Sequence, residues 1–149
     1  MISPSRKLFY VVEAMVTIAY NAGQGAVSSR EIAKRQGLPS RYLEQLMQRL
    51  VRGGLLRGMR GPHGGYVLAK ERRRITLADI YAAMGDEKEE DNIGYKVTKL
   101  GEIIVQPAWE KLNEEMLQNL KKINLADLCE QAEQKKIAKN SKEKSDFII

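Results

Sequence analysis

The chain has 149 residues, which leaves room for one ordinary domain or a small domain with a helical extension, and excludes two large domains. Hydrophobic residues make up 43% and charged residues 30%, a globular composition that excludes a disordered chain. The apolar runs are far shorter than the ~20 residues of a membrane span, and no signal-peptide pattern is present. We therefore expect a soluble, cytoplasmic protein with no membrane partner.

The formal charge of +6 is unevenly distributed along the chain. Residues 1–75 carry 14 Lys and Arg against 4 Asp and Glu, whereas residues 76–149 carry 11 against 15. This asymmetry favours a nucleic-acid face, although a solvated basic surface has the same composition. A single cysteine, Cys129, and a single histidine, His63, exclude a disulfide framework and a self-contained zinc site. No catalytic motif is present, so the chain is not expected to be an enzyme.

Two amphipathic helices are predicted first. The first begins at Pro4, where the missing N–H costs nothing, and ends near residues 21–23. The second begins at Ser28, which forms a capping box with Glu31, and ends at Gly37.

A third helix is predicted from Ser40 to about Gly53, with one apolar and one polar face. Its polar face carries Arg41, Gln45, Gln48 and Arg52. Two helices joined by a tight glycine-containing turn are typical of a helix-turn-helix, whose second helix fits the major groove, about 12 Å wide. An ordinary helical hairpin with a polar outer face is the alternative.

Two short extended runs, residues 55–60 and 65–69, flank a Gly/Pro turn at 61–64 and predict a β-hairpin. A hairpin that directly follows a recognition helix is a wing, and Arg60 beside its small tip can enter a narrow minor groove. A structural hairpin whose glycines serve only the turn is the alternative.

The remainder is predicted to be helical around an acidic loop. Thr76 caps a short helix, and the related pattern at 123–128 predicts another helix from near Asn124. Between them, apolar residues at helical spacing from 97 to 120 form a stripe that needs a partner, and Pro107 kinks or splits that helix. The tail from residue 130 is expected to be a weak helix or a mobile end.

Three motifs, Tyr42-Leu43-Glu44-Gln45-Leu46, Gly54-Leu55-Leu56 and Arg60-Gly61-Pro62-His63-Gly64-Gly65-Tyr66, resemble the Rrf-two family of bacterial transcriptional regulators. The resemblance extends more loosely to residue 80, and residues 109–128 resemble the family's long dimerisation helix. It implies a mainly α protein with a small β-hairpin wing. The implied parts are a winged helix-turn-helix domain at 1–85, an acidic loop at 86–96, a dimerisation helix region at 97–129 and a C-terminal tail at 130–149.

The resemblance implies a sequence-specific DNA-binding regulator, a repressor on our interpretation, that acts as a homodimer on an inverted-repeat operator in double-stranded DNA. The candidate DNA-binding residues are Ser28, Ser40, Arg41, Tyr42, Glu44, Gln45, Arg49, Arg60, Gly61, Pro62, His63 and Gly64. The candidate dimerisation residues are Ile104, Trp109, Leu112, Met116 and Leu120. Ser40 is also the expected cap of the third helix, because Pro39 stands where relatives often have a serine.

The effector is left open by the sequence. Several relatives hold an iron-sulfur cluster with three cysteines in the loop before the long helix, and residues 85–97 contain none. Three-cysteine ligation is therefore excluded, and no cofactor is expected. Cys129 is a candidate redox residue or a buried small hydrophobe, and a small molecule or a protein could serve as effector. The alternative function is a dimeric interaction protein that docks to an enzyme through its acidic half, with weak or no DNA binding.

Overall fold

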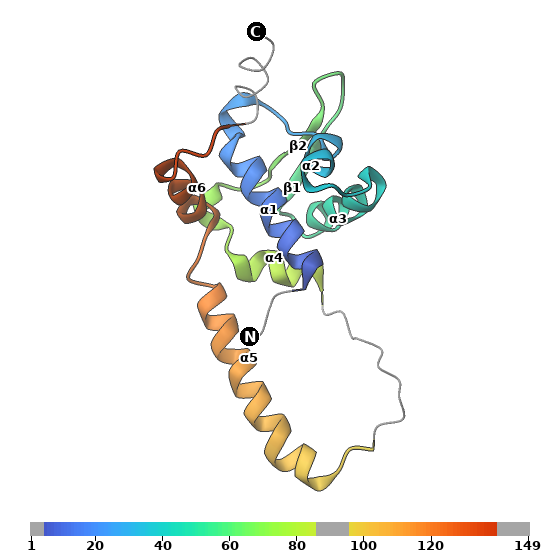
Figure 1. Ribbon diagram of the computed structural model, residues 1–149, viewed down its shortest axis with the longest axis vertical. Coiled ribbons are helices and arrows are strands. Elements are labelled where there is room, and N and C mark those ends of the chain that lie inside the picture. Colours follow the sequence, from blue (N-terminus) through green and yellow to red (C-terminus); the bar gives the residue numbers. More distant parts are fainter. Residues whose placement is uncertain (1–4, 86–95, 140–149) are drawn as a thin grey trace.

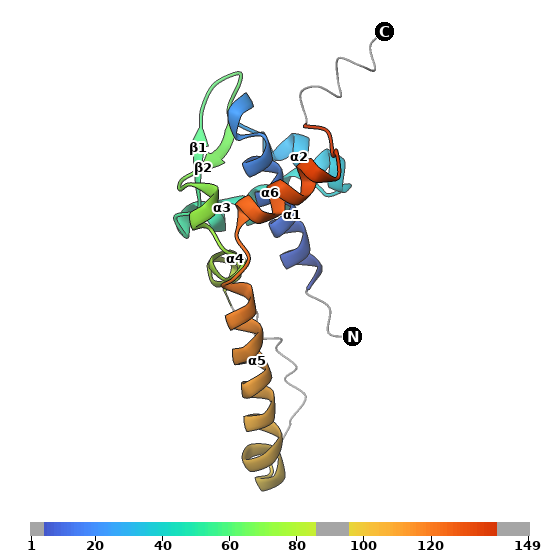
Figure 2. The same ribbon diagram turned by 90° about the vertical axis from the view of Figure 1, so that its left-hand side faces the viewer.

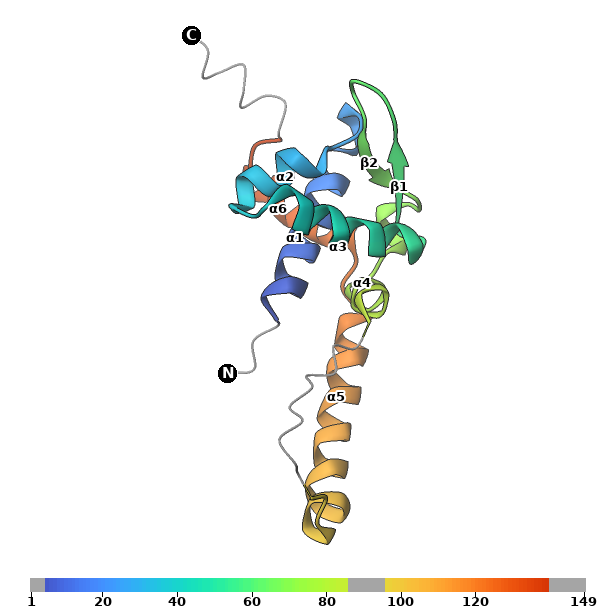
Figure 3. The same cartoon turned by 90° about the vertical axis from the view of Figure 1, so that its right-hand side faces the viewer.

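The computed structural model describes residues 5–85 and 96–139, which form a small domain with one long helix projecting from it (Figure 1). The hairpin lies at one end of the domain and the projecting helix at the other, as the two side views also show (Figures 2 and 3). The expected fold class, mainly α with a two-stranded antiparallel hairpin, is confirmed. The elements are α1 (Arg6–Tyr20), α2 (Ser29–Gln36), α3 (Ser40–Arg52), β1 (Leu56–Met59), β2 (Gly65–Leu68), α4 (Leu77–Met84), α5 (Gln106–Leu120) and α6 (Leu125–Gln134), with short 3₁₀ turns η1 (Ala22–Gln24) and η2 (Arg72–Arg74).

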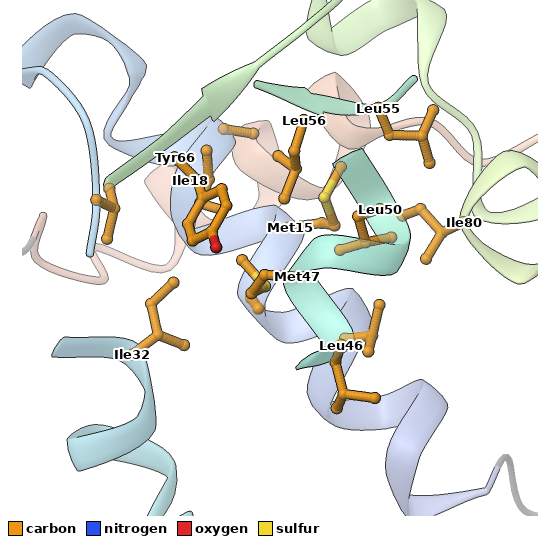
Figure 4. Packing of buried hydrophobic residues seen from close by; sticks show 14 of the residues in the cluster. Met15, Ile18, Ile32, Leu46, Met47, Leu50, Leu55, Leu56, Tyr66 and Ile80 are labelled. Atoms are coloured by element: carbon orange, nitrogen blue, oxygen red, sulfur yellow. The ribbon is translucent and has the colours of Figure 1, made fainter. Parts of the chain in front are cut away.

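The core forms around α1, whose apolar face is covered by the other elements of the domain (Figure 4). Met15 and Ile18 of α1 are almost completely buried, as are Met47 and Leu50 of α3. Burying such side chains stabilises a fold by roughly 1.5–3 kcal/mol each, so the shared core, together with the contacts of α3 with α2, α4 and β1, fixes how α3 lies on the domain.

Two helix starts differ from expectation. Helix α1 begins at Arg6, because the extended Ser5 caps it by accepting a hydrogen bond from the Leu8 backbone N–H at 3.2 Å. The expected start at Pro4 is therefore wrong, and Pro4 itself lies outside the described residues. The expected cap of α3 at Ser40 is also wrong, because Pro39 is the extended residue that precedes the helix and its carbonyl accepts from Leu43 at 3.2 Å.

The helix-turn-helix is formed by α2 and α3. The Ser28 hydroxyl accepts a hydrogen bond from the Glu31 backbone N–H at 3.1 Å, as expected of the cap. Gly37 adopts a left-handed conformation with φ of 68°, which ends α2 and turns the chain into α3.

The hairpin is fastened to the domain by a third segment. Strands β1 and β2 pair with Leu56 opposite Leu68 and Gly58 opposite Tyr66. Tyr66 also exchanges two backbone hydrogen bonds with Val27, at 2.8 and 3.0 Å. A Cβ at Gly65 would collide with the Val27 carbonyl, so this glycine permits close backbone packing rather than serving only the turn.

The two related helix starts, residues 75–80 and 123–128, lie side by side and antiparallel. Leu77 donates to the Ile123 carbonyl at 2.9 Å and Leu125 donates to the Ile75 carbonyl at 2.9 Å. Each start has a complete capping box, formed by Thr76 with Asp79 and by Asn124 with Asp127. These bonds join the segment that follows α5 to the segment at which α4 begins.

The long helix is continuous through Pro107. A π-helical turn, Gly101–Val105, immediately precedes α5, and the chain is helical from Lys99 to Leu120. Proline lacks the N–H that would bond to the fourth residue before it, and the wider π turn accommodates this loss. The proline therefore does not split the helix.

Helix α6 crosses the expected boundary between residues 129 and 130. It packs on α1 and buries Leu125 and Cys129, and residues 130–134, expected to be a weak helix or a mobile end, form its last part. Residues 86–95 of the acidic loop and residues 140–149 lie outside the described ranges. Within those ranges, no helix combines the length and apolarity that crossing a membrane requires.

We predict that Asn124→Ala lowers the free energy of unfolding by about 1 kcal/mol, because it removes one half of a capping box. Urea unfolding followed by circular dichroism measures the change. Asn119→Ala, at an exposed position on α5, is the control and should stay within about 0.5 kcal/mol of the wild type. Equal effects of the two substitutions would show that the cap does not stabilise the junction.

Candidate nucleic-acid interface

Helix α3 buries one face and exposes the other. Its buried residues are Leu43, Leu46, Met47 and Leu50. The candidates Arg41, Tyr42, Glu44 and Gln45 are exposed, and Arg49 is half-buried. Figure 3 shows α3 lying across the front of the domain with the hairpin above it. The structure thus gathers the predicted α3 residues on its outward surface.

The two candidate serines lie at the starts of the two helices. Ser28 is half-buried and its hydroxyl caps α2, so its oxygen is already engaged while its proton can still be donated. Ser40 is exposed as the first residue of α3. Both positions place a small hydroxyl near a helix N-terminus, where anions such as phosphate bind favourably.

The wing presents its tip to solvent. Arg60, Gly61, Pro62 and His63 are exposed, and Gly64 is half-buried. Gly61 has φ of 112°, and its carbonyl accepts from the Gly64 N–H at 2.9 Å, which closes the tip. A compact tip beside one arginine has the shape that a narrow minor groove can admit.

A hydrogen bond that sequence reasoning missed joins α3 to the wing. The Gln48 amide nitrogen donates to the Tyr66 hydroxyl at 3.0 Å, and the Tyr66 ring is buried in the core (Figure 4). Burial raises the pKa of Tyr66; the bond from Gln48 lowers it and the nearby Glu44 carboxylate raises it. The hydroxyl therefore stays protonated at neutral pH. The sequence signal was the tyrosine that closes the wing motif, but nothing in the sequence pairs it with Gln48.

Not all arginines of the basic half share this face. Arg72, Arg73 and Arg74 form η2, which packs against α6. Helix α6 lies on the opposite side of α1 from α3 (Figures 1 and 3). The surface of α3 and the wing therefore carries fewer arginines than the charge of residues 1–75 suggested.

Cys129 has the surroundings of a structural cysteine. Its side chain is 3% exposed. Burial raises the pKa of its thiol, which the Arg72 guanidinium and the Lys139 ammonium partly offset. A reactive cysteine requires an accessible thiolate, and these surroundings disfavour one. The redox role of Cys129 stays a prediction, and the burial of its thiol argues against that role.

The projecting helix, residues 99–120 and called the arm below, exposes the apolar stripe that was predicted to dimerise. Ile104, Trp109, Leu112 and Met116 are 47–60% exposed. Leu120 is half-buried and lines an apolar groove with Leu8, Phe9, Val12 and Leu77. The stripe is wider than predicted, because Ile103, Val105 and Leu117 are also exposed. A contiguous apolar surface of this kind marks an interaction site.

Comparisons with known proteins agree with this geometry. Residues 4–131 match the Rrf2 family, described as "Iron-dependent Transcriptional regulator". The chain is similar to NMB1378 of Neisseria meningitidis, with 37% identity over 124 residues, covering 82% of this chain and 84% of that protein. Among solved structures, T. potens IscR aligns with a TM-score of 0.74 and 34% identity, covering 93% of this chain and 94% of that one. CymR, the global cysteine regulator of B. subtilis, aligns with a TM-score of 0.67 and 29% identity, covering 88% of this chain and 98% of that one.

We predict that Tyr66→Phe lowers the free energy of unfolding by about 1 kcal/mol, because the Gln48 amide loses its acceptor. Tyr42→Phe removes a hydroxyl from the exposed face of α3 and should leave stability unchanged. Urea unfolding measures both variants. A Tyr66→Phe protein as stable as the wild type would show that the bond does not join α3 to the wing.

Proposed function

Because the chain belongs to the Rrf2 family and is a DNA-binding transcription regulator, we propose that it acts as a homodimer on an inverted-repeat operator. The observation that carries this proposal is that one chain exposes two different surfaces. One is the polar face of α3 and the other is the apolar stripe of the arm. The first fits a major groove and the second fits a copy of itself.

In the proposed complex, α3 lies in the major groove and reads base edges. The Gln45 amide has the donor and acceptor needed to bond an adenine edge bidentately, and the Glu44 carboxylate can accept from cytosine N4. Arg41 and Arg49 meet phosphates, which position the helix without reading sequence. Arg60 enters the adjacent minor groove, where the negative potential is concentrated.

The arm supplies the surface that contacts the second copy of the chain. An α5 helix that leaves Trp109 and Leu112 about half exposed is unfavourable in water, and pairing two arms around a twofold axis removes both stripes from solvent. Two recognition helices related by such an axis read half-sites about 34–36 Å apart, one turn of B-DNA. A dimer on an operator that overlaps a promoter blocks polymerase, so we propose repression.

We further propose that this regulator works in the cytoplasm without a three-cysteine iron-sulfur cluster. The family description names iron, but the chain contains one cysteine and one histidine. The described residues include no group of three or more His, Cys, Asp or Glu side chains that could hold a metal ion. Cys129, with its raised thiol pKa, does not fit the thiolate ligands that such clusters need.

We predict that Gln45→Ala relaxes discrimination at one base pair by about 1–3 kcal/mol, and that Arg60→Ala weakens binding to the operator. Fluorescence anisotropy with a genomic fragment selected by the wild type, at several salt concentrations, measures both. Arg73→Ala is the control, because Arg73 lies on η2, which packs against α6 and is not on the face of α3 and the wing. It should leave Kd unchanged. If Gln45→Ala and Arg60→Ala behave like the control while salt still weakens binding, α3 and the wing are not the DNA-binding surface.

We predict that Leu112→Glu converts the protein to a monomer, because it places a charge in the centre of the apolar stripe. Sedimentation velocity and light scattering report the mass. Gln118→Glu adds the same charge to α5 away from the stripe and should leave the dimer intact. A monomeric wild type, or a Leu112→Glu variant that is still dimeric, contradicts the proposed interface.

A further inference from the structure

Gln48 lies on the exposed face of α3 but is not among the candidate DNA-binding residues. Residues three and four positions apart share one face of a helix, so Arg41, Gln45 and Gln48 form a continuous row with Glu44 beside it. All four side chains are exposed. From residue 41 to residue 48 the helix rises about 10 Å, which spans about three base pairs of B-DNA. Gln48 therefore belongs to the surface that the proposed function places in the major groove.

The Gln48 side chain is held at its nitrogen end by a buried group. Its amide nitrogen donates to the Tyr66 hydroxyl at 3.0 Å. Tyr66 is 7% exposed, its ring lies among the core side chains (Figure 4), and its backbone is bonded to Val27 at 2.8 and 3.0 Å. An exposed glutamine normally loses rotamer freedom when it binds a partner. The bond to Tyr66 already restricts Gln48, which favours a contact of fixed geometry with a base.

The surroundings of the Tyr66 hydroxyl determine which end of the Gln48 amide it holds. The Glu44 carboxylate is near enough to raise the pKa of the Tyr66 phenol. Because a carboxylate only accepts, it favours the hydroxyl proton on its own side and leaves the hydroxyl oxygen to accept from Gln48. Among the residues that the structure describes, no group donates to the Gln48 Oε1 atom. The acceptor end of the amide is therefore the end left for another molecule.

An acceptor at this place distinguishes two classes of base in the major groove. Adenine N6 and cytosine N4 are amino groups that donate, whereas guanine O6 and thymine O4 are acceptors. The Gln48 nitrogen keeps a second hydrogen, but this atom is anchored at the buried Tyr66 hydroxyl, so the oxygen is the end that can advance to a base. An amino base satisfies this oxygen, and a keto base leaves two acceptors facing each other without a proton.

We propose that Gln48 determines DNA sequence specificity by accepting a hydrogen bond from a base amino group at Oε1, and that Tyr66 is the positioning residue that orients it. The inference rests on the proposed function, because it requires α3 to lie in the major groove. It predicts one position in each half-site at which adenine or cytosine is preferred to guanine or thymine on the strand that Gln48 contacts. It also makes β2 of the wing part of the reading of bases by α3.

The test measures binding of the full chain to synthetic duplexes that carry the operator located by footprinting, with each base pair of one half-site changed in turn. Fluorescence anisotropy gives the Kd for each duplex. At one position, distinct from the position that Gln45→Ala affects, exchange of an amino base for a keto base should weaken wild-type binding about tenfold. Gln48→Ala should lose this discrimination and no other. The compared quantity is the ratio of two Kd values within one variant, which a uniform change of affinity or stability leaves unaltered.

Three further variants test the chemistry of the contact. Gln48→Glu keeps an acceptor and should keep the preference for the amino base, although the added charge weakens binding to every duplex. Gln48→Lys offers only donors and should reverse the preference to the keto base. Tyr66→Phe releases the amide to rotate and should reduce the discrimination at this position, whereas a purely structural role would weaken binding to all duplexes equally. Gln131→Ala, at an exposed position of α6, is the matched control and should have the wild-type profile.

The outcomes separate this inference from the proposed function. If Gln48→Ala and Gln48→Lys keep the wild-type profile while Gln45→Ala changes it, Gln48 reads no base and the proposed function stands. A wild-type profile in Tyr66→Phe overturns the positioning role of the tyrosine. Binding of the wild-type chain without a base preference at any position contradicts both this inference and the proposed reading of sequence by α3.

Discussion

The burial of the apolar face of α3 in the core that it shares with α1 is the constraint on which the rest of the structure depends. Met47 and Leu50 are held in the core together with Met15 and Ile18 of α1. Because α3 is apolar along only one stripe, burying that stripe turns the opposite, polar face to solvent. The proposed recognition surface is therefore a consequence of core packing. The wing is held beside this surface by the backbone hydrogen bonds between Val27 and Tyr66 and by the Gln48–Tyr66 bond.

A second constraint sets the direction of the arm. The paired helix starts around Thr76 and Asn124 tie the end of α5 to the start of α4 with backbone hydrogen bonds, and the capping boxes satisfy the backbone groups that helix ends otherwise leave free. In the proposed dimer, an arm anchored in this way would transmit the position of its partner to the domain. In a dimer, the distance between two recognition helices would be set by these junctions together with the paired arms.

Much of this could be predicted from the sequence because it depends on local patterns. Helix α3, the hairpin, the caps at Ser28, Thr76 and Asn124 and the family were all predicted from spacing and motif. Features that depend on tertiary contacts were not. The packing of α6 on α1 depends on what lies across the fold. The start of α1 at Arg6 after the Ser5 cap, and the π turn before Pro107, are local outcomes among alternatives that the sequence pattern did not separate. The Gln48–Tyr66 bond joins residues 18 positions apart, and no sequence pattern pairs them.

The most direct test of two recognition helices held at a fixed spacing is the dependence of binding on operator length. Once a footprint has located the two half-sites, about five base pairs, half a helical turn, are inserted between them, which turns one half-site to the opposite side of the duplex. We predict that the affinity falls to that for non-specific DNA, a loss of at least about a thousandfold. Unchanged affinity for the lengthened operator would show that the two domains bind independently, and would contradict the account of a rigid, arm-paired dimer.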